Sequence, residues 1–193
     1  MVYSPSREPR ASRYRSALKR GPVRDPPRGT RGPERAPGSW RGLHAAHRRT
    51  PMRFDGRCHC GNIEVTFETS HPPASLQLRE CRCTFCRRHG QTSVTDPAGK
   101  LEVRVRDPAA VSRYQFGLRT SEFLICRTCG VFVTAVCTID GRTYATLNAN
   151  TLEDRPAFTQ RPVPVDFDAE NVEERLARRR RSWTPAVEAP SLA

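Results

Sequence analysis

The sequence lacks any long apolar run. Its first 51 residues contain no continuous apolar stretch, so they form neither a secretory signal nor a membrane span. The same segment is poor in acidic residues, with 13 Lys and Arg against 3 Asp and Glu, and has few apolar residues. Such a segment cannot bury enough apolar surface to offset the entropy of ordering, so we expect residues 1–51 to be disordered.

The basic charge of the chain is concentrated in this first segment. The formal net charge is +13, but residues 52–193 are nearly balanced, with 20 Lys and Arg against 17 Asp and Glu. An arm that binds nucleic acid fits the charge of residues 1–51. The many prolines argue against the amphipathic helix of a transit peptide. We favour a simpler interpretation, an extension without function ahead of a compact domain that starts at Met52.

Beyond Met52, several short segments alternate apolar and polar residues with the period of a half-buried strand. No long stretch has helical periodicity, and no internal repeat is evident. The expected strands are 62–69, 76–79, 101–105, 111–116, 121–125, 131–139, 142–147 and, more weakly, 163–167. Asp140-Gly141 predicts a tight hairpin turn. The pattern predicts a mainly β domain of short antiparallel strands over residues 52–168.

The C-terminal part, residues 169–193, has weaker signals. A helix that ends in a basic run is expected over 170–181. The last dozen residues have the composition of a loose tail. We therefore expect a C-terminal helix or tail outside the β domain.

The sequence is rich in clustered cysteine. Seven of its eight cysteines fall in a C-x-C pair, a C-x-C-x2-C triplet and a C-x2-C pair. They are Cys58 and Cys60, then Cys81, Cys83 and Cys86, then Cys126 and Cys129. Without an export signal we expect a cytoplasmic protein, where clustered thiols indicate metal binding or catalysis rather than disulfides.

The two outer pairs predict a closed structural site. Thiolate sulfur is a soft ligand that suits zinc, and a structural zinc site takes four ligands. Cys126 and Cys129, followed by Gly130, resemble half of a zinc knuckle. Cys58 and Cys60 are the natural second half, because they would tie the start of the sheet to its middle.

The triplet predicts a second zinc site of a different kind. Cys81, Cys83 and Cys86 supply three ligands, which is the pattern of a catalytic zinc with an open fourth position. Two roles stay open for His89, three residues further on: it closes the site as a fourth ligand, or it acts nearby in proton transfer.

The basic residues around the triplet have two interpretations. Arg82, Arg87 and Arg88 either bind carboxylates of a thiol substrate or are solvated surface charges. The remaining cysteine, Cys137, alternates within an apolar strand, and we expect it to be a small core residue.

Three motifs, in this order, resemble those of the glutathione-dependent formaldehyde-activating enzyme family, which includes centromere protein V-like proteins. They are G-x-C-H-C-G at 56–61, C-x-C-x2-C-R-R at 81–88 and C-x2-C-G at 126–130. The resemblance covers about residues 52–160. It implies a β-tent fold built mainly of antiparallel strands.

The resemblance also implies a site and a reaction. It implies two zinc ions per chain: a structural zinc on Cys58, Cys60, Cys126 and Cys129, and a catalytic zinc on Cys81, Cys83 and Cys86. The implied activity joins formaldehyde to glutathione and gives S-hydroxymethylglutathione, and it is classed as a carbon–sulfur lyase for the reverse direction. The substrate thiol, glutathione in this family, would be held by the second zinc.

A binding module is the alternative class of function. Both metals would then be structural, His89 would be a ligand, and the domain would dock protein or nucleic acid with help from residues 1–51. We favour the enzyme, because three clustered thiolates with an open position match a catalytic site.

Overall fold

The computed structural model describes residues 50–189, and this part of the chain is mainly β. Its strands are β1 (Met52–Arg57), β2 (Ile63–Thr69), β3 (Arg79–Cys81), β4 (Ser93–Val94), β5 (Lys100–Val105), β6 (Val111–Tyr114), β7 (Glu122–Cys126), β8 (Phe132–Ile139), β9 (Arg142–Asn148), β10 (Val163–Val165) and β11 (Thr184–Ala189). Its α-helices are α1 (Thr84–Arg88) and α2 (Val172–Ser182), and short 3-10 helices span Pro73–Ser75, Pro108–Ala110, Ala149–Thr151 and Arg155–Ala157. We expect residues 1–51 to be disordered. Of these residues, 1–49 lie outside the described range.

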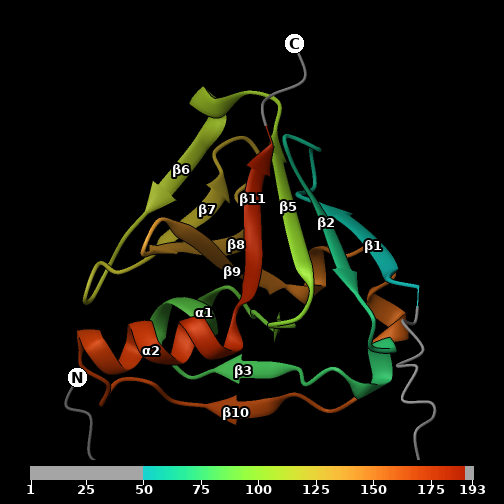
Figure 1. Cartoon of the computed structure of the whole chain (residues 1–193). Coiled ribbons are helices and arrows are strands. Elements are labelled where there is room, and N and C mark those ends of the chain that lie inside the picture. The colour runs from blue at the N-terminus through green and yellow to red at the C-terminus, as the bar shows by residue number, and fades with distance from the viewer. Residues whose placement is uncertain (1–49, 190–193) are drawn as a thin grey trace, which may run out of the picture. The chain divides into compact units, whose positions relative to one another are not determined.

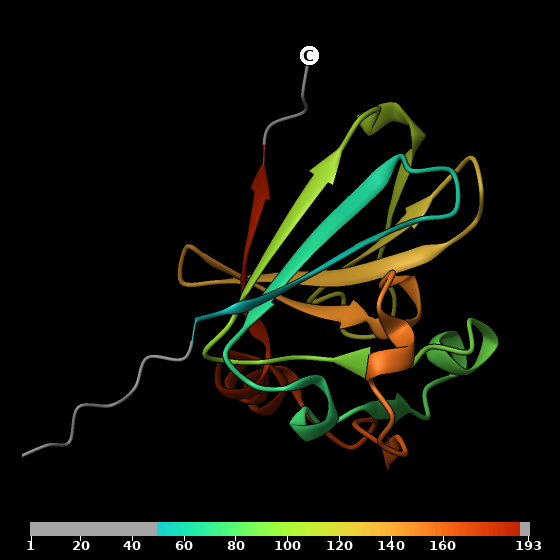
Figure 2. The same cartoon turned by 90° about the vertical axis from the view of Figure 1, so that its right-hand side faces the viewer.

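The strands form one open sheet that folds over itself. Its order is β1-β2-β5-β11-β9-β4-β3-β10, and β8, β7 and β6 extend from β9. In Figure 1, β2, β5 and β6 lean toward a common apex above a base of β3, β10 and the two helices. The side view in Figure 2 again places the base below the slanting strands. This arrangement confirms the mainly β domain that the alternation pattern predicts and the tent that the resemblance implies.

Most expected strands are present with small shifts of their ends. The strongest local signal, Asp140-Gly141, joins β8 to β9 in an antiparallel hairpin. Both turn residues have positive φ, 49° and 73°, as the two-residue hairpin turn that Asp-Gly favours requires.

Strand β1 was not expected. Its outward side chains are charged, and one of its inward positions is a glycine, so alternation is weak in the sequence. Gly56 lies against the loop around Thr151, and a Cβ on it would stand 2.6 Å from the Thr151 carbonyl oxygen. Gly56 thus has two effects. It weakens the strand pattern in the sequence, and it allows the loop around Thr151 to approach β1.

The loose tail expected for the last dozen residues is wrong for Thr184–Ala189. This segment is β11, which pairs parallel with β5 and antiparallel with β9. The side chains of Thr184 and Ala186 are buried. Its T-P-A-V-E-A sequence has little strand signal, so the neighbouring strands determine its conformation. The sheet therefore continues beyond residue 168.

Two hydrophobic clusters form the core. The larger lies among the leaning strands and includes Phe54, Phe67 and Leu101. The smaller packs Trp183 and the partly buried Leu176 against β8. It contains Cys137, only 4% exposed, which confirms the expected core role. No helix within residues 50–189 is long and apolar enough to cross a membrane.

A buried polar contact fixes the start of β11. The Asp96 N–H donates to Thr184 Oγ1 at 2.9 Å, and both residues are buried. We expect Thr184→Val to lower the free energy of unfolding by about 1–3 kcal/mol, because it leaves this N–H without an acceptor. Urea unfolding measures the change. Thr184→Ser keeps the hydroxyl and should lose less; equal losses in both variants would show that packing, not the hydrogen bond, matters here.

Candidate metal centres and the adjoining cavity

Four cysteine sulfurs from two distant parts of the chain lie together. The sulfur atoms of this four-cysteine group, Cys58, Cys60, Cys126 and Cys129, all lie within 4.8 Å of one another. The Cys60 sulfur is 3.7 Å from that of Cys58 and 3.4 Å from that of Cys126. These distances far exceed the roughly 2 Å of a disulfide bond, and all four thiols are free.

Each pair of the four-cysteine group lies at a hairpin turn, and Cys126 is the last residue of β7. The first turn joins β1 to β2, and the second joins β7 to β8. The Gly61 N–H donates to the Cys58 carbonyl at 3.0 Å, and the Gly130 N–H donates to the Cys126 carbonyl at 2.8 Å. Both glycines have positive φ, 79° and 75°, a conformation that glycine adopts readily. The two turns thus present their thiols with similar local geometry.

The donor set of the four-cysteine group suits a metal ion. Cys58 and Cys126 are buried, whereas Cys60 is exposed and Cys129 is half-buried. Four ionised sulfurs this close would repel one another strongly without a cation between them. Sulfur is a soft ligand, and four ligands complete a tetrahedral site. The group could therefore hold a metal ion.

The three-cysteine group, Cys81, Cys83 and Cys86, lies where a strand changes into a helix. Its sulfur atoms also lie within 4.8 Å of one another. Cys81 is the last residue of β3, Cys83 caps the N-terminus of α1, and Cys86 is buried within α1. The Cys83 sulfur accepts a hydrogen bond from the Cys86 N–H at 3.4 Å. The helical turn therefore brings the last thiol back to the first two.

The thiols of the three-cysteine group differ in pKa. Hydrogen bonds from Cys81 and Cys86 lower the pKa of the Cys83 thiol to about 2. The same contacts, together with burial, raise the pKa of the Cys86 thiol far above its usual range. One thiolate thus forms readily, and a metal would have to displace protons from its two neighbours.

His89 does not complete the three-cysteine group. Among the described residues, the group that could hold a metal here contains only the three cysteines. The His89 ring instead packs against Phe85, with ring centroids 4.3 Å apart. The protein thus supplies three sulfur ligands at this place and, within residues 50–189, no imidazole.

A cavity of about 270 Å³ adjoins the three-cysteine group. Its lining comes from β3, β4, the loop before β7, the segment after β10, and α2; among the lining residues are Arg79, Cys81, Cys83, Cys86, Gln91, Phe116, Phe123, Phe167, Arg178 and Trp183. Aromatic side chains and a few polar groups are the usual lining of a small-molecule site. The three sulfurs are therefore reachable by a small ligand.

The arginines that line the cavity are not the ones next to the cysteines in sequence. Arg82, Arg87 and Arg88 are exposed, and none of them lines it. Four others do: Arg79 from β3, and Arg175, Arg178 and Arg179 from α2. The basic run at the end of the expected helix contains Arg178 and Arg179 but not Arg175. The sequence does not show that any of these residues lies near the triplet, because that depends on the fold.

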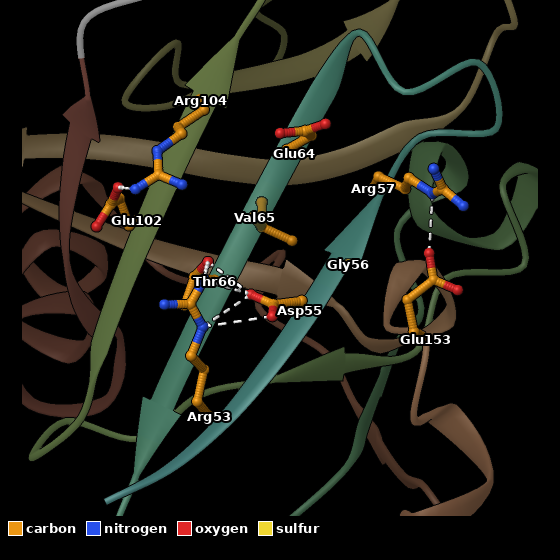
Figure 3. Close-up of a pocket in the computed structure, with 10 residues that line it drawn as sticks. All are labelled: Arg53, Asp55, Gly56, Arg57, Glu64, Val65, Thr66, Glu102, Arg104 and Glu153. Carbon is orange, nitrogen blue, oxygen red and sulfur yellow. Dashed lines mark hydrogen bonds and ion pairs between the residues drawn. The ribbon is translucent and has the colours of Figure 1, made fainter. Parts of the chain in front are cut away.

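A second hollow, of about 280 Å³, lies on β1, β2 and β5 and contains no thiol. Figure 3 shows Arg53 paired with Asp55, Arg57 with Glu153 and Arg104 with Glu102. Glu64 pairs with Arg106, which does not line the hollow. Arg53 lies 3.0 Å from Asp55, and Arg57 lies 2.9 Å from Glu153. Because these charges are already compensated and no reactive group is present, the thiol-lined cavity is the candidate site.

One buried side chain in that cavity has no signal in the sequence. Gln91 is 4% exposed, and its Oε1 has no hydrogen-bond partner in the described part of the chain. Its backbone N–H donates to the Cys86 carbonyl at 3.1 Å, which holds it beside the three-cysteine group. A buried amide oxygen without a partner is unfavourable by itself, so this residue marks a place for a polar ligand.

Fold and site together define a β protein with two sulfur clusters, each able to hold a metal ion, and a cavity beside one of them. The sequence model of the glutathione-dependent formaldehyde-activating enzyme family matches residues 53–164. The chain belongs to this family. The matched range contains all seven clustered cysteines, and the family description associates the chain with formaldehyde activation and glutathione.

Other comparisons add little. A search of curated proteins found no match. Among solved structures, a crystal structure of a Rhodobacter sphaeroides protein is 33% identical, covering 57% of this chain and 97% of that chain, with a TM-score of 0.43.

Removal of the unpartnered amide tests this description of the cavity. Gln91→Met keeps the length of the side chain and removes its polar group. We expect the free energy of unfolding to stay the same or to rise, by up to about 1–3 kcal/mol, because the unsatisfied oxygen disappears. Urea unfolding at neutral pH measures it. A loss of that size would instead show that Gln91 is hydrogen-bonded in solution.

Proposed function

We propose that the protein is a zinc-dependent enzyme that joins a thiol such as glutathione to formaldehyde or a related small aldehyde. In the reverse direction it would be a carbon–sulfur lyase. The observation that supports this proposal is the placement of three sulfur ligands on the wall of a cavity, with no fourth protein ligand among residues 50–189. An open position in a sulfur-ligated zinc site is the arrangement expected of a catalytic metal.

The two cysteine groups would hold one zinc each, with different tasks. Cys81, Cys83 and Cys86 would hold the catalytic ion, and Cys58, Cys60, Cys126 and Cys129 the structural one. When bound, the catalytic zinc supplies a positive charge that keeps a coordinating thiol ionised near neutral pH. The four-cysteine group lines neither of the two cavities described above, which fits a structural task.

The proposed reaction adds the thiol to the carbonyl group of the aldehyde. The S–H bond of the thiol and the π bond of the carbonyl break, a bond forms between sulfur and the aldehyde carbon, and the aldehyde oxygen takes up the proton as a hydroxyl. Phe116 and Phe123 line the cavity and would exclude water from the reacting atoms. The unpartnered Oε1 of the buried Gln91 would accept a hydrogen bond from the hydroxyl group that the aldehyde oxygen becomes.

The packing of His89 supports the enzyme over a binding module. In the binding-module hypothesis both metal sites are closed, with His89 as the fourth ligand of the triplet. The contact of its ring with Phe85 and its absence from the three-cysteine group disfavour that arrangement.

The proposal is tested by measuring how fast formaldehyde and glutathione exchange with their adduct. We expect the zinc-loaded full-length chain to accelerate the exchange of formaldehyde and glutathione with their adduct, measured by NMR against the uncatalysed reaction. Cys83→Ala should abolish the acceleration, because it removes a ligand of the open site. A zinc-loaded protein that gives no acceleration would contradict the proposed reaction.

The metal content of two variants tests the division between the sites. Cys83→Ala should lose one zinc per chain and stay folded, since β3 remains paired with β4 and β10. Cys129→Ala should lose the other zinc and unfold, because structural zinc contributes folding free energy directly. Elemental analysis and circular dichroism give both readouts. If the two variants unfold alike, the assignment of one structural and one catalytic site is wrong.

A further inference from the structure

Arg79 lies beside the three-cysteine group on the same strand. Side chains two residues apart on a strand face the same side, and Arg79 and Cys81 both line the cavity. Their spacing along β3 is about 7 Å. The Arg79 guanidinium donates a hydrogen bond to the Thr95 hydroxyl at 2.8 Å, which orients it. It is therefore positioned within reach of any small molecule whose sulfur approaches the three thiols.

Arg79 differs from the other cavity arginines in its partners. Arg178 donates two hydrogen bonds to Glu170, at 2.7 and 2.9 Å, and its guanidinium carbon lies 3.6 Å from the centroid of the Phe167 ring. Arg175 also contacts Glu170, at 3.6 Å. The guanidinium of Arg179 donates to Thr120 and Ser121. These three side chains are fixed by the protein itself.

No carboxylate compensates Arg79. Among residues 50–189, none of the ion pairs includes it, and its one hydrogen bond goes to a neutral hydroxyl. The side chain is only partly exposed. The one carboxylate that lines the cavity, Asp168, is exposed. A partly buried cation without a counter-ion is unfavourable, and an incoming anion would relieve it.

We propose that Arg79 binds a carboxylate of the thiol substrate and thereby selects anionic thiols. This inference rests on the proposed function. A guanidinium binds a carboxylate with two parallel, charge-assisted hydrogen bonds. The spacing along β3 favours thiols whose carboxylate lies a few bonds from sulfur, such as mercaptocarboxylates and short cysteinyl peptides. Arg79, rather than the exposed arginines of α1, is then the specificity-determining residue.

A competing role for Arg79 is to balance the charge of the cysteines themselves. Three thiolates with one zinc ion carry a net negative charge, which a nearby guanidinium would stabilise. The two roles predict different outcomes on substitution. Loss of a substrate contact affects anionic thiols alone, whereas loss of a counter-ion lowers zinc content and affects every thiol equally.

The test compares two thiols of similar size, mercaptopropionate with a carboxylate and mercaptoethanol without one. Zinc-loaded full-length protein is assayed with formaldehyde and each thiol, as wild type, Arg79→Met, Arg79→Lys and Arg88→Met. We expect Arg79→Met to lower kcat/KM for mercaptopropionate by about ten- to a hundredfold, the value of a charge-assisted hydrogen bond, and to leave mercaptoethanol within about twofold. Arg79→Lys should recover part of the loss, and the exposed control Arg88→Met should change neither substrate.

Each other result has a distinct meaning. Equal losses for both thiols, with less zinc bound, would overturn the proposal in favour of the counter-ion role. No loss in Arg79→Met would also overturn it and place the carboxylate elsewhere. If the wild type accelerates neither thiol, the proposed reaction fails, and calorimetric titration of wild type and Arg79→Met with mercaptopropionate still decides whether Arg79 binds the carboxylate.

Discussion

The close spacing of cysteine sulfurs is the constraint on which the structure depends. Two hairpin turns, one at the start of the domain and one 66 residues later, bring sulfur atoms as close as 3.4 Å. Without a shared proton or a metal ion, ionised sulfurs at this distance would push the turns apart. A cation between them would turn that repulsion into a cross-link between β1–β2 and β7–β8. The three-cysteine group also needs a proton or a cation between its sulfurs. There the sulfurs are brought together by the end of β3 and the start of α1.

The two cysteine groups differ in their surroundings, and only one of them is accessible from a cavity. The four-cysteine group lies in the turns of its hairpins, whereas the three-cysteine group opens on a cavity. Part of that cavity comes from outside the family match, which ends at residue 164. Phe167, α2 and Trp183 lie beyond it, and they supply two aromatic rings and three arginines to the lining. The cysteine ligands thus come from the shared family segment, and a C-terminal segment shapes the space beside them.

The sequence allowed the thiols and most strands to be predicted, because both signals are local. Cysteine spacing reports a turn or a helix start directly, and alternation reports a strand with one buried face. The cavity was not predictable in the same way. Arg79 and Gln91 have no motif of their own, and their importance depends on the cavity that the fold forms around them. Strand β11 was missed since its neighbours β5 and β9, not its own residues, determine its conformation.

Cadmium NMR of the cadmium-substituted full-length protein tests the central claim most directly, because each sulfur environment gives its own signal. We predict two signals, one from the four-cysteine group and one from the three-cysteine group. On addition of glutathione, only the second should shift, since only that site has an open position beside the cavity. A single signal, or two signals neither of which shifts when the thiol is added, would contradict the assignment of one closed and one open metal site.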